Sequence, residues 1–420
     1  MKSLFLILTS AAFALAADKV PSSKLVDLAH TRPQSSDFRE ALMATLGEAN
    51  IQKGTAWAGG GPDFIFAVES EKEPSIVIDY EEPGHAMSKL GASAWYYTTQ
   101  LKTGTSHAFY YLIDGKPFGG NQNIPAYLPE SFARPGVPQG KLSEKLVHTS
   151  KIYDGMQSDY WIYVPAEYNA SQPAALMVWQ DGQGHIDRDN ATHTLNVIDN
   201  LIYEKAIPVM IQVFISPGKI GNRAMRSVEY DTMNDTYARF LRDEVLPEVY
   251  AKYNIRKDGY SRGITGSSSG GICAFNVAWR ENDQFTRVWS RIGSFTSIQW
   301  HMGELDGGNT FPFLIRKTNP KKNIRAWLQD GEEDLENNHG SWPLQNLQMA
   351  NSLKMMGYDF HLTFGVGTHN GAHANSQMPA ALAWLWRGYD PSKTEETFVQ
   401  DPAEKDKPFF RVRALNRDRE

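Results

Sequence analysis

One stretch of sequence decides the fold, Arg262-Gly263-Ile264-Thr265-Gly266-Ser267-Ser268-Ser269-Gly270-Gly271. Its first four residues predict a short β-strand, and residues 274–279 continue as a helix. Between them, residues 266–270 match G-x-S-x-G, which holds a serine on a sharp strand-to-helix turn. The motif alone is weak because Gly and Ser are common, but the flanking strand and helix are the context it requires. Ser268 is therefore predicted to be a nucleophile at the end of a strand.

The alternation of strand and helix continues on both sides of this stretch. Apolar runs predict strands at residues 158–164, 174–179, 207–214, 324–328 and 361–364, and helices at 194–205, 231–246 and 378–386. A continuous apolar run such as 174–179 is typical of a strand covered on both faces. Residues 141–392 are thus predicted to form an α/β domain, a mostly parallel sheet with helices on both faces.

The first third of the chain has a different period. Short β-rich runs at residues 63–68, 75–78, 94–97 and 108–113 are separated by turn formers, which predicts a small β-sandwich domain over residues 36–124. Residues 125–140 contain four prolines and are predicted to be a Pro-rich linker. Residues 393–420 are predicted to be a C-terminal tail.

The N-terminus has the pattern of an export signal. Lys2 precedes a mostly apolar stretch over residues 4–15, and Ala14-Leu15-Ala16 fits a small-x-small cleavage site. A membrane-spanning helix needs ~20 apolar residues, so this stretch is too short to be an anchor, and no later stretch is long enough. We expect residues 1–16 to be a signal peptide and the protein to be secreted or periplasmic. The sequons at Asn169, Asn190 and Asn234 would then matter only in a eukaryotic secretory pathway.

Composition excludes several classes of protein. The chain is 41% hydrophobic and 21% charged, which excludes a disordered protein. A net charge of -6 without any Lys/Arg-rich run argues against nucleic acid as a partner. The single cysteine, Cys273, allows neither an intramolecular disulfide nor a thiolate metal cluster, and no H-E-x-x-H motif is present. No metal or organic cofactor is expected.

A serine nucleophile of this type needs an acid and then a histidine later in the chain. Residues 327–334 predict a strand that ends in a loop with several carboxylates, of which Asp330 and Asp334 are the rival candidates. Residues 364–369 predict a later strand that ends at His369, with His373 as its rival. All candidates fall at the carboxyl ends of strands, where an open α/β sheet builds its site.

The oxyanion of an acyl-transfer intermediate needs backbone N–H donors. One is expected from Ser269, the residue after the nucleophile. The other is expected from the Gly-rich loop 180–184, where Gly182 or Gln183 is the candidate because a glycine there would let the backbone approach the substrate.

Several motifs carry a family resemblance. They are residues 226–231 (Arg-Ser-Val-Glu-Tyr-Asp), 268–275, 328–331 (Leu-Gln-Asp-Gly), 338–343 (Asn-His-Gly-Ser-Trp-Pro), 367–369 and 383–386. With them the chain resembles the enterochelin esterase-like family of the α/β-hydrolases, which is related to feruloyl esterases. The resemblance implies an α/β-hydrolase fold preceded by an immunoglobulin-like domain. It also implies Asp334 as the acid, three residues after the glycine of the Asp-Gly loop, and His369 as the histidine.

The sequence therefore predicts a secreted serine esterase that forms a covalent acyl-enzyme through Ser268, His369 and Asp334. Its substrate would be a small-molecule ester, either a catechol siderophore or a carbohydrate or phenolic ester. The alternative is a carbohydrate- or ligand-binding protein whose hydrolase-like domain is inactive. An intact set of serine, acid and histidine argues against that alternative.

Overall fold

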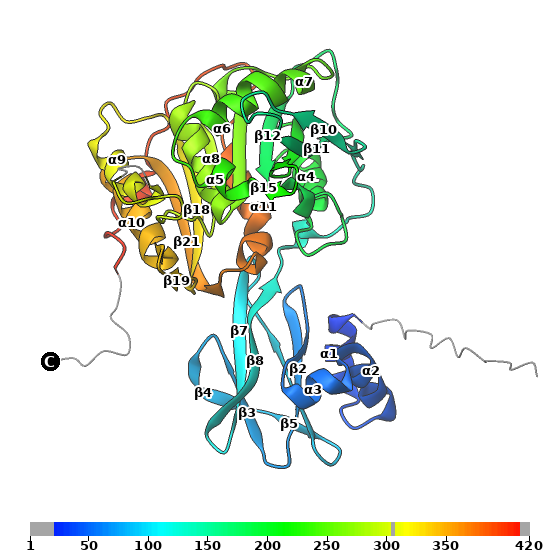
Figure 1. Cartoon of the computed structure of the whole chain (residues 1–420). Coiled ribbons are helices and arrows are strands. Elements are labelled where there is room, and N and C mark those ends of the chain that lie inside the picture. The colour runs from blue at the N-terminus through cyan, green and yellow to red at the C-terminus, as the bar shows by residue number, and fades with distance from the viewer. Residues whose placement is uncertain (1–20, 304–306, 412–420) are drawn as a thin grey trace, which may run out of the picture. The chain divides into compact units, whose positions relative to one another are not determined.

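The computed structural model describes residues 21–303 and 307–411, so the predicted signal peptide at residues 1–16 lies outside the described residues. The chain forms two compact units (Figure 1). The smaller unit contains the described residues up to Gln100 together with Phe109–Gly120, and the larger contains Leu101–Ala108 and the described residues from Asn121 onward. Strands β7 (Thr105–Ile113) and β8 (Lys116–Ala126) thus contribute residues to both.

The smaller unit is built on two four-stranded sheets and three helices. The sheet orders are β1-β2-β6-β5 and β4-β3-β7-β8. All five central residues of β2 are buried because both its faces are covered. Ile65 and Ala67 pack with Phe38 and Leu42 of the helices. The other elements are α1 (Ser22–Thr31), α2 (Ser36–Leu46), α3 (Glu48–Lys53), β1 (Ala56–Ala58), β2 (Asp63–Glu69), β3 (Pro74–Ile78), β4 (Glu81–Ala86), β5 (Ser88–Leu90) and β6 (Ala94–Gln100).

The opposite face of β2 meets the second sheet. The ring centroids of Phe66 on β2 and Phe109 on β7 are 4.8 Å apart. The hydroxyl of Tyr111 on β7 donates a hydrogen bond of 3.1 Å to the carbonyl of Ala67. Two sheets packed through such contacts form a β-sandwich. Its immunoglobulin-like topology stays a prediction.

The larger unit contains an eleven-stranded mixed sheet in the part of the chain that the structure describes. Its main order is β15-β14-β11-β13-β12-β16-β17-β18-β21, and β9 and β10 pair with β11. The strands are β9 (Lys141–Leu142), β10 (Leu146–Thr149), β11 (Gln157–Val164), β12 (Ala175–Gln180), β13 (Met210–Ile215), β14 (Lys219–Ile220), β15 (Arg223–Ala224), β16 (Arg262–Ser267), β17 (Arg287–Arg291), β18 (Arg325–Glu333) and β21 (Asp359–Thr368). The short pair β19 (Glu336–Asn337) and β20 (Gly340–Ser341) is separate.

The prediction of a mostly parallel sheet holds only for the part from β13 to the edge strand β21. The six strands from β13 to β21 in the main order are joined by parallel registers. The pairings of β11 with β9, β10, β13 and β14, and of β14 with β15, are antiparallel. The sheet is therefore mixed, with parallel and antiparallel pairs. Short turns can join antiparallel neighbours, whereas parallel neighbours need longer crossover connections, which are usually helices.

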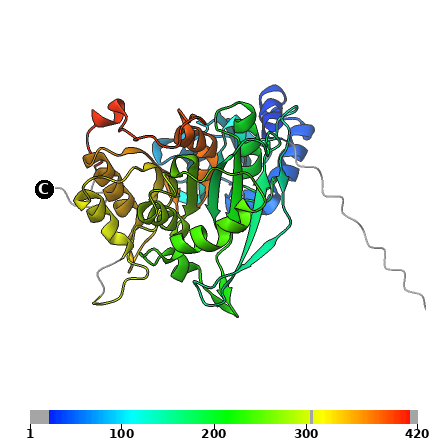
Figure 2. The same ribbon diagram turned by 90° about the horizontal axis from the view of Figure 1, so that it is seen from above.

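Helices cover both faces of this sheet (Figure 1; Figure 2). Alternate residues of a strand point to opposite faces. On β12, Leu176 and Val178 belong to the hydrophobic core that includes residues of α5–α10, whereas Met177 and Trp179 belong to the core that includes residues of α4 and α11. This explains the continuous apolar run. The helices are α4 (Thr194–Tyr203), α5 (Arg226–Tyr230), α6 (Thr236–Arg239), α7 (Leu246–Tyr250), α8 (Ser269–Arg280), α9 (Phe311–Lys317), α10 (Trp342–Met355), α11 (Ala372–Trp386) and α12 (Pro402–Lys405).

The regular helix predicted over residues 231–246 is confirmed only in part, since residues 236–250 are helical but irregular. The chain instead forms α5, then α6, a π-helical turn at Phe240–Val245 and α7. Pro247 lies in the first turn of α7 instead of ending a helix. Because proline has no N–H to donate four residues back, it is tolerated in a first turn, and the wider π turn before it takes up the irregularity.

Residues 125–140, predicted as a linker, belong to the larger unit and pack against α4. The Asn200 side chain donates hydrogen bonds of 2.8 Å to the carbonyls of Glu130 and Phe132. Arg134 pairs with Glu204. The predicted tail also packs, since Phe398 is only 2% exposed. In the described part of the chain, no helix has the length and apolar character needed to cross a membrane.

Because Glu229 on α5 is buried, we predict that the stability of the folded protein depends on pH. Glu229 is 2% exposed, and burial raises its pKa from 4.5 to about 8, although the Gly218 N–H donates to it at 2.7 Å. The folded protein binds this proton more tightly than the unfolded chain, so stability falls as the pH rises from 4.5 to about 8. Glu229→Gln keeps an acceptor and carries no charge, so its melting temperature should fall less over that range. Parallel melting-temperature curves for the two proteins would contradict this.

Candidate active site

The three candidate residues each follow directly after a strand. Ser268 follows β16, Asp334 follows β18 and His369 follows β21. These strands are parallel and lie in the order β16-β17-β18-β21. Because parallel strands end at the same edge of a sheet, the three side chains are brought to one place.

Ser268 has a backbone conformation that residues other than glycine rarely adopt, with φ 58° and ψ -123°. Its N–H donates to the carbonyl of Arg291 at 2.9 Å, and its own carbonyl accepts from Gly271 N at 2.8 Å. A Cβ at Gly266 would lie 2.3 Å from the carbonyl oxygen of Gly270. The first glycine of the motif is therefore required, because any larger side chain at this position would collide with the backbone of Gly270.

A chain of hydrogen bonds joins the three candidates. His369 Nε2 lies 2.7 Å from Ser268 Oγ, and His369 Nδ1 lies 2.5 Å from Asp334 Oδ1. The Asp334 side chain is fully buried, whereas the imidazole is 22% exposed. Burial alone would raise the pKa of Asp334, but hydrogen bonds from His369 and Asp330 lower it. The two nitrogens of the His369 imidazole are thus hydrogen-bonded to the Asp334 carboxyl group on one side and to the Ser268 hydroxyl on the other.

A glycine lets the strands of the acid and the histidine approach closely. A Cβ at Gly331 on β18 would lie 2.1 Å from the carbonyl oxygen of Gly367 on β21. The register of the two strands shifts between Gly331 and Glu333, which then pairs with Thr368. Such a bulge turns the end of a strand. Asp334 and His369 therefore emerge side by side.

Asp330 occupies a different place from Asp334. It is 0% exposed, and its oxygens accept from Gly331 N at 2.9 Å and from Asn346 Nδ2 at 2.8 Å. Burial, followed by its hydrogen bond to Asp334 and the charge of that group, raises the pKa of Asp330 well above its usual range. Of the two acids, Asp334 is the one that contacts the imidazole.

His373, the rival histidine, lies on α11 and does not contact Ser268. Its Nδ1 is 3.2 Å from Nε2 of Gln329, and burial lowers its pKa to about 4. Of the two histidines, His369 is the one that the structure brings to the serine.

The three candidate oxyanion residues have free backbone donors. No described residue accepts a hydrogen bond from the N–H of Ser269, Gly182 or Gln183. Gly182 also packs closely against β13, because a Cβ there would lie 2.3 Å from Ile215 N. Its approach to the substrate stays a prediction.

Comparison with known proteins identifies the family. The model of the family described as "Putative esterase" matches residues 155–385, more than half of the chain. The chain belongs to this esterase family. Membership makes it a carboxylic ester hydrolase.

Two solved enterobactin esterase structures share the fold of this chain. The enterobactin esterase FES from Shigella flexneri matches with 16% identity and a TM-score of 0.52, covering 78% of this chain and 94% of that chain. Ferric enterobactin esterase from Salmonella typhimurium matches with 15% identity and a TM-score of 0.54, covering 77% and 93%. A ferulic acid esterase matches with 19% identity and a TM-score of 0.47, covering 60% and 99%.

The esterase also has an arginine clamp that sequence reasoning did not assign. Arg226 donates two hydrogen bonds of 2.8 Å to the carboxylate of Asp181, the residue before Gly182. Its Nη2 also lies 3.3 Å from the carbonyl oxygen of Ser267. Arg226 therefore ties the loop of the candidate oxyanion donors to the strand of the nucleophile. The signal was present, since Arg226 begins one of the family motifs.

Two further residues, Ser294 and Trp342, lie next to Ser268 and His369. Ser294 Oγ lies 3.2 Å from Ser268 Oγ and accepts from Trp342 Nε1 at 3.0 Å. The Trp342 ring stands edge-on to the His369 ring, with centroids 5.7 Å apart. Trp342 was part of a family motif, whereas nothing local marked Ser294.

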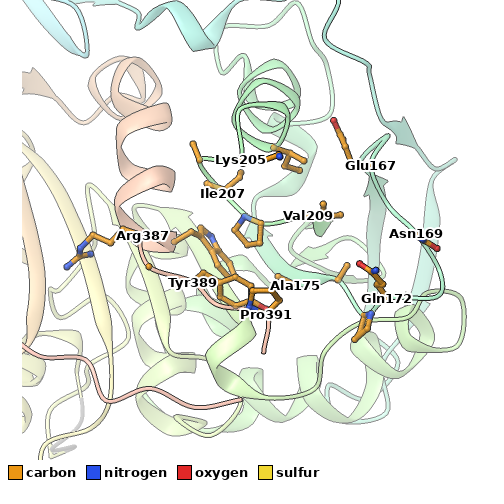
Figure 3. Close-up of a pocket in the computed structure, with 17 residues that line it drawn as sticks. Glu167, Asn169, Gln172, Ala175, Lys205, Ile207, Val209, Arg387, Tyr389 and Pro391 are labelled. Carbon is orange, nitrogen blue, oxygen red and sulfur yellow. The ribbon is translucent and has the colours of Figure 1, made fainter. Parts of the chain in front are cut away.

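One cavity, drawn in Figure 3, is not lined by any of the candidate residues. It has a volume of about 530 Å³ and is lined at the starts of β12 and β13 by Ala175 and Val209, and by Tyr389 after α11. The strands begin here, whereas Ser268 follows the end of one. Across residues 21–303 and 307–411, no three His, Cys, Asp or Glu side chains are grouped as a metal site would require.

Proposed function

We propose that this esterase is a serine esterase in which Ser268 is the nucleophile, His369 the general base and Asp334 the residue that orients the imidazole. The single observation that supports this best is the hydrogen-bond chain of 2.7 Å and 2.5 Å through the two nitrogens of His369. Distances near 2.6–3.2 Å are those at which a base can take a proton from a hydroxyl.

The proposed reaction has two halves. Ser268 Oγ attacks the ester carbonyl carbon while its proton moves to His369 Nε2. The tetrahedral intermediate then collapses as His369 gives that proton to the leaving alcohol, which leaves an acyl-enzyme. Water attacks the acyl-enzyme by the same proton path and releases the carboxylic acid. Asp334 stabilises the imidazolium that forms in each half.

The negative oxygen of each intermediate would be held by backbone donors. The N–H of Ser269 lies at the N-terminus of α8, where the helix dipole favours negative charge. We assign the second donor to Gln183 or Gly182, since neither N–H has an acceptor among the described residues. The clamp of Arg226 on Asp181 would keep that loop in place.

We propose a small-molecule ester as substrate, either a catechol siderophore or a carbohydrate or phenolic ester. The support is that the structural neighbours are an enterobactin esterase and a ferulic acid esterase by their names. We also propose that residues 1–16 direct the protein out of the cytoplasm, on the pattern of its apolar segment.

Replacing the nucleophile tests the proposal. Ser268→Ala should lower kcat by ~10⁴–10⁶-fold and leave the melting temperature nearly unchanged, since only one hydroxyl is lost. The assay measures turnover of p-nitrophenyl, feruloyl and catechol-siderophore esters. Ser267→Ala is the matched control on the preceding, half-buried serine and should keep wild-type turnover. Near-normal turnover by Ser268→Ala would refute the serine mechanism, and a wild-type protein without turnover would favour the binding protein.

The two aspartates should respond differently to amide substitution. Asp334→Asn should lower kcat by ~10³–10⁴-fold with little change in melting temperature, because the imidazolium loses its charged partner and its tautomer control. Asp330→Asn changes a group that makes no hydrogen bond with the imidazole in the described part of the chain and whose raised pKa favours the neutral form, so kcat should stay within ~10-fold. Asparagine has one acceptor oxygen in place of two, so the hydrogen bond from either Gly331 N or Asn346 Nδ2 is lost. The melting temperature of the variant should therefore fall. The reverse pattern in kcat and melting temperature would exchange the two roles.

A further inference from the structure

A residue far away in the sequence holds the backbone directly before His369. Asn123 lies on β8, and Thr368 is the last residue of β21. The two are 245 positions apart, and both belong to the larger unit. Nothing in the proposed reaction uses Asn123.

Three contacts join the Asn123 amide group to Thr368. The N–H of Thr368 donates to Asn123 Oδ1 at 3.1 Å. Asn123 Nδ2 donates to Thr368 Oγ1 at 2.9 Å, and that hydroxyl also lies 3.1 Å from Asn123 Oδ1, to which it can donate. Both residues are only partly exposed. One side chain thus fixes both a peptide group and a hydroxyl.

Asn123 is itself fixed before it makes these contacts. Its N–H donates to Oδ1 of Asn121 at 2.8 Å, which is the hydrogen bond of an Asx turn. Gly367, one residue further back on β21, also faces it, since a Cβ there would lie 3.7 Å from Asn123 Oδ1. The end of β8 is therefore a preformed support for the end of β21.

The position of the imidazole depends on this support. His369 must satisfy Ser268 and Asp334 at once, at 2.7 Å and 2.5 Å. On its other side the chain turns at once, with Asn370 N donating to the carbonyl of Thr368 at 2.6 Å. A displacement of about 1 Å at a reacting group can cost ~10²-fold in rate. Because Thr368 directly precedes His369, any movement of the Thr368 backbone would displace the His369 imidazole.

We propose that Asn123 is a positioning residue for His369, and that it sets the geometry of proton transfer through the backbone of Thr368. This inference rests on the proposed serine mechanism. It makes β8, a strand that also contributes residues to the smaller unit, part of the catalytic framework.

The first test is Asn123→Ala, measured with the ester that the wild-type protein turns over. We expect kcat to fall ~10–100-fold with KM within ~2-fold, because substrate contacts are untouched and the base is displaced. The downfield proton resonance of the His369 Nδ1–H···Asp334 hydrogen bond should weaken or disappear in the NMR spectrum. A purely structural role for Asn123 would lower the melting temperature and leave both readouts unchanged.

Asn282→Ala is the matched control. Asn282 Nδ2 donates to the carbonyl of Asn323 at 3.0 Å, and its Oδ1 accepts from Asn323 N at 2.9 Å. Asn282 lies between α8 and β17 and braces the backbone just before β18 through both amide atoms, and among the described residues it has no hydrogen bond to a candidate residue. The kcat and the His369 Nδ1–H resonance of Asn282→Ala should match those of the wild-type protein, even if the melting temperature of the variant is lower.

A second pair of variants keeps the inference testable if Asn123→Ala does not fold. Thr368→Val removes the hydroxyl and keeps the shape, and should lower kcat ~3–10-fold, the effect of one lost hydrogen bond. Thr368→Ser keeps the hydroxyl and should stay within ~2-fold. The double variant Asn123→Ala/Thr368→Val should be no slower than Asn123→Ala alone, because both act through one contact.

The outcomes separate this inference from the proposed function. If Ser268→Ala keeps its turnover, the serine mechanism itself is wrong. If Ser268→Ala is inactive while Asn123→Ala and Thr368→Val keep wild-type kcat and the His369 resonance, the mechanism stands and the role of Asn123 is refuted.

Discussion

The site depends on the backbone of Ser268, which holds a conformation that L-residues avoid. Strain of this kind costs about 1–3 kcal/mol and persists only where the surroundings enforce it. Here the enforcement comes from the carbonyl of Arg291 on the next strand and from the first turn of α8. The result is that the hydroxyl leaves the sheet and meets His369. A relaxed turn would keep the same residues and lose the contact.

The electrostatics of the acid follow from crowding two carboxyl groups at the end of β18. Two negative charges side by side in a buried place are unfavourable, so the pKa values of the two groups move apart. Burial and the charge of Asp334 raise the pKa of Asp330, although the N–H donors of Asn346 and Gly331 lower it. Burial also raises the pKa of Asp334, but the hydrogen bond with His369 contributes to lowering it overall, so the more acidic group is the one beside the imidazole.

The sequence was sufficient where the chemistry is local. The turn at Ser268 is recognisable because strand, glycines and helix are consecutive, and the order of Ser268, Asp334 and His369 could be read along the chain. The structure brings these three together. Contacts between distant segments leave no such pattern, so Asn123 and Ser294 were missed. The raised pKa of Asp330 and the irregular helix after Asp231 were missed for the same reason, since both depend on tertiary packing.

The central claim is that the strained turn makes Ser268 a nucleophile among three consecutive serines. It is tested most directly by treating the wild-type protein with a fluorophosphonate and locating the adduct by peptide mass spectrometry. The account predicts one phosphonyl group per chain, on Ser268, with loss of ester hydrolysis in step with labelling. An adduct on Ser267 or Ser269, or full labelling that leaves ester hydrolysis intact, would contradict it.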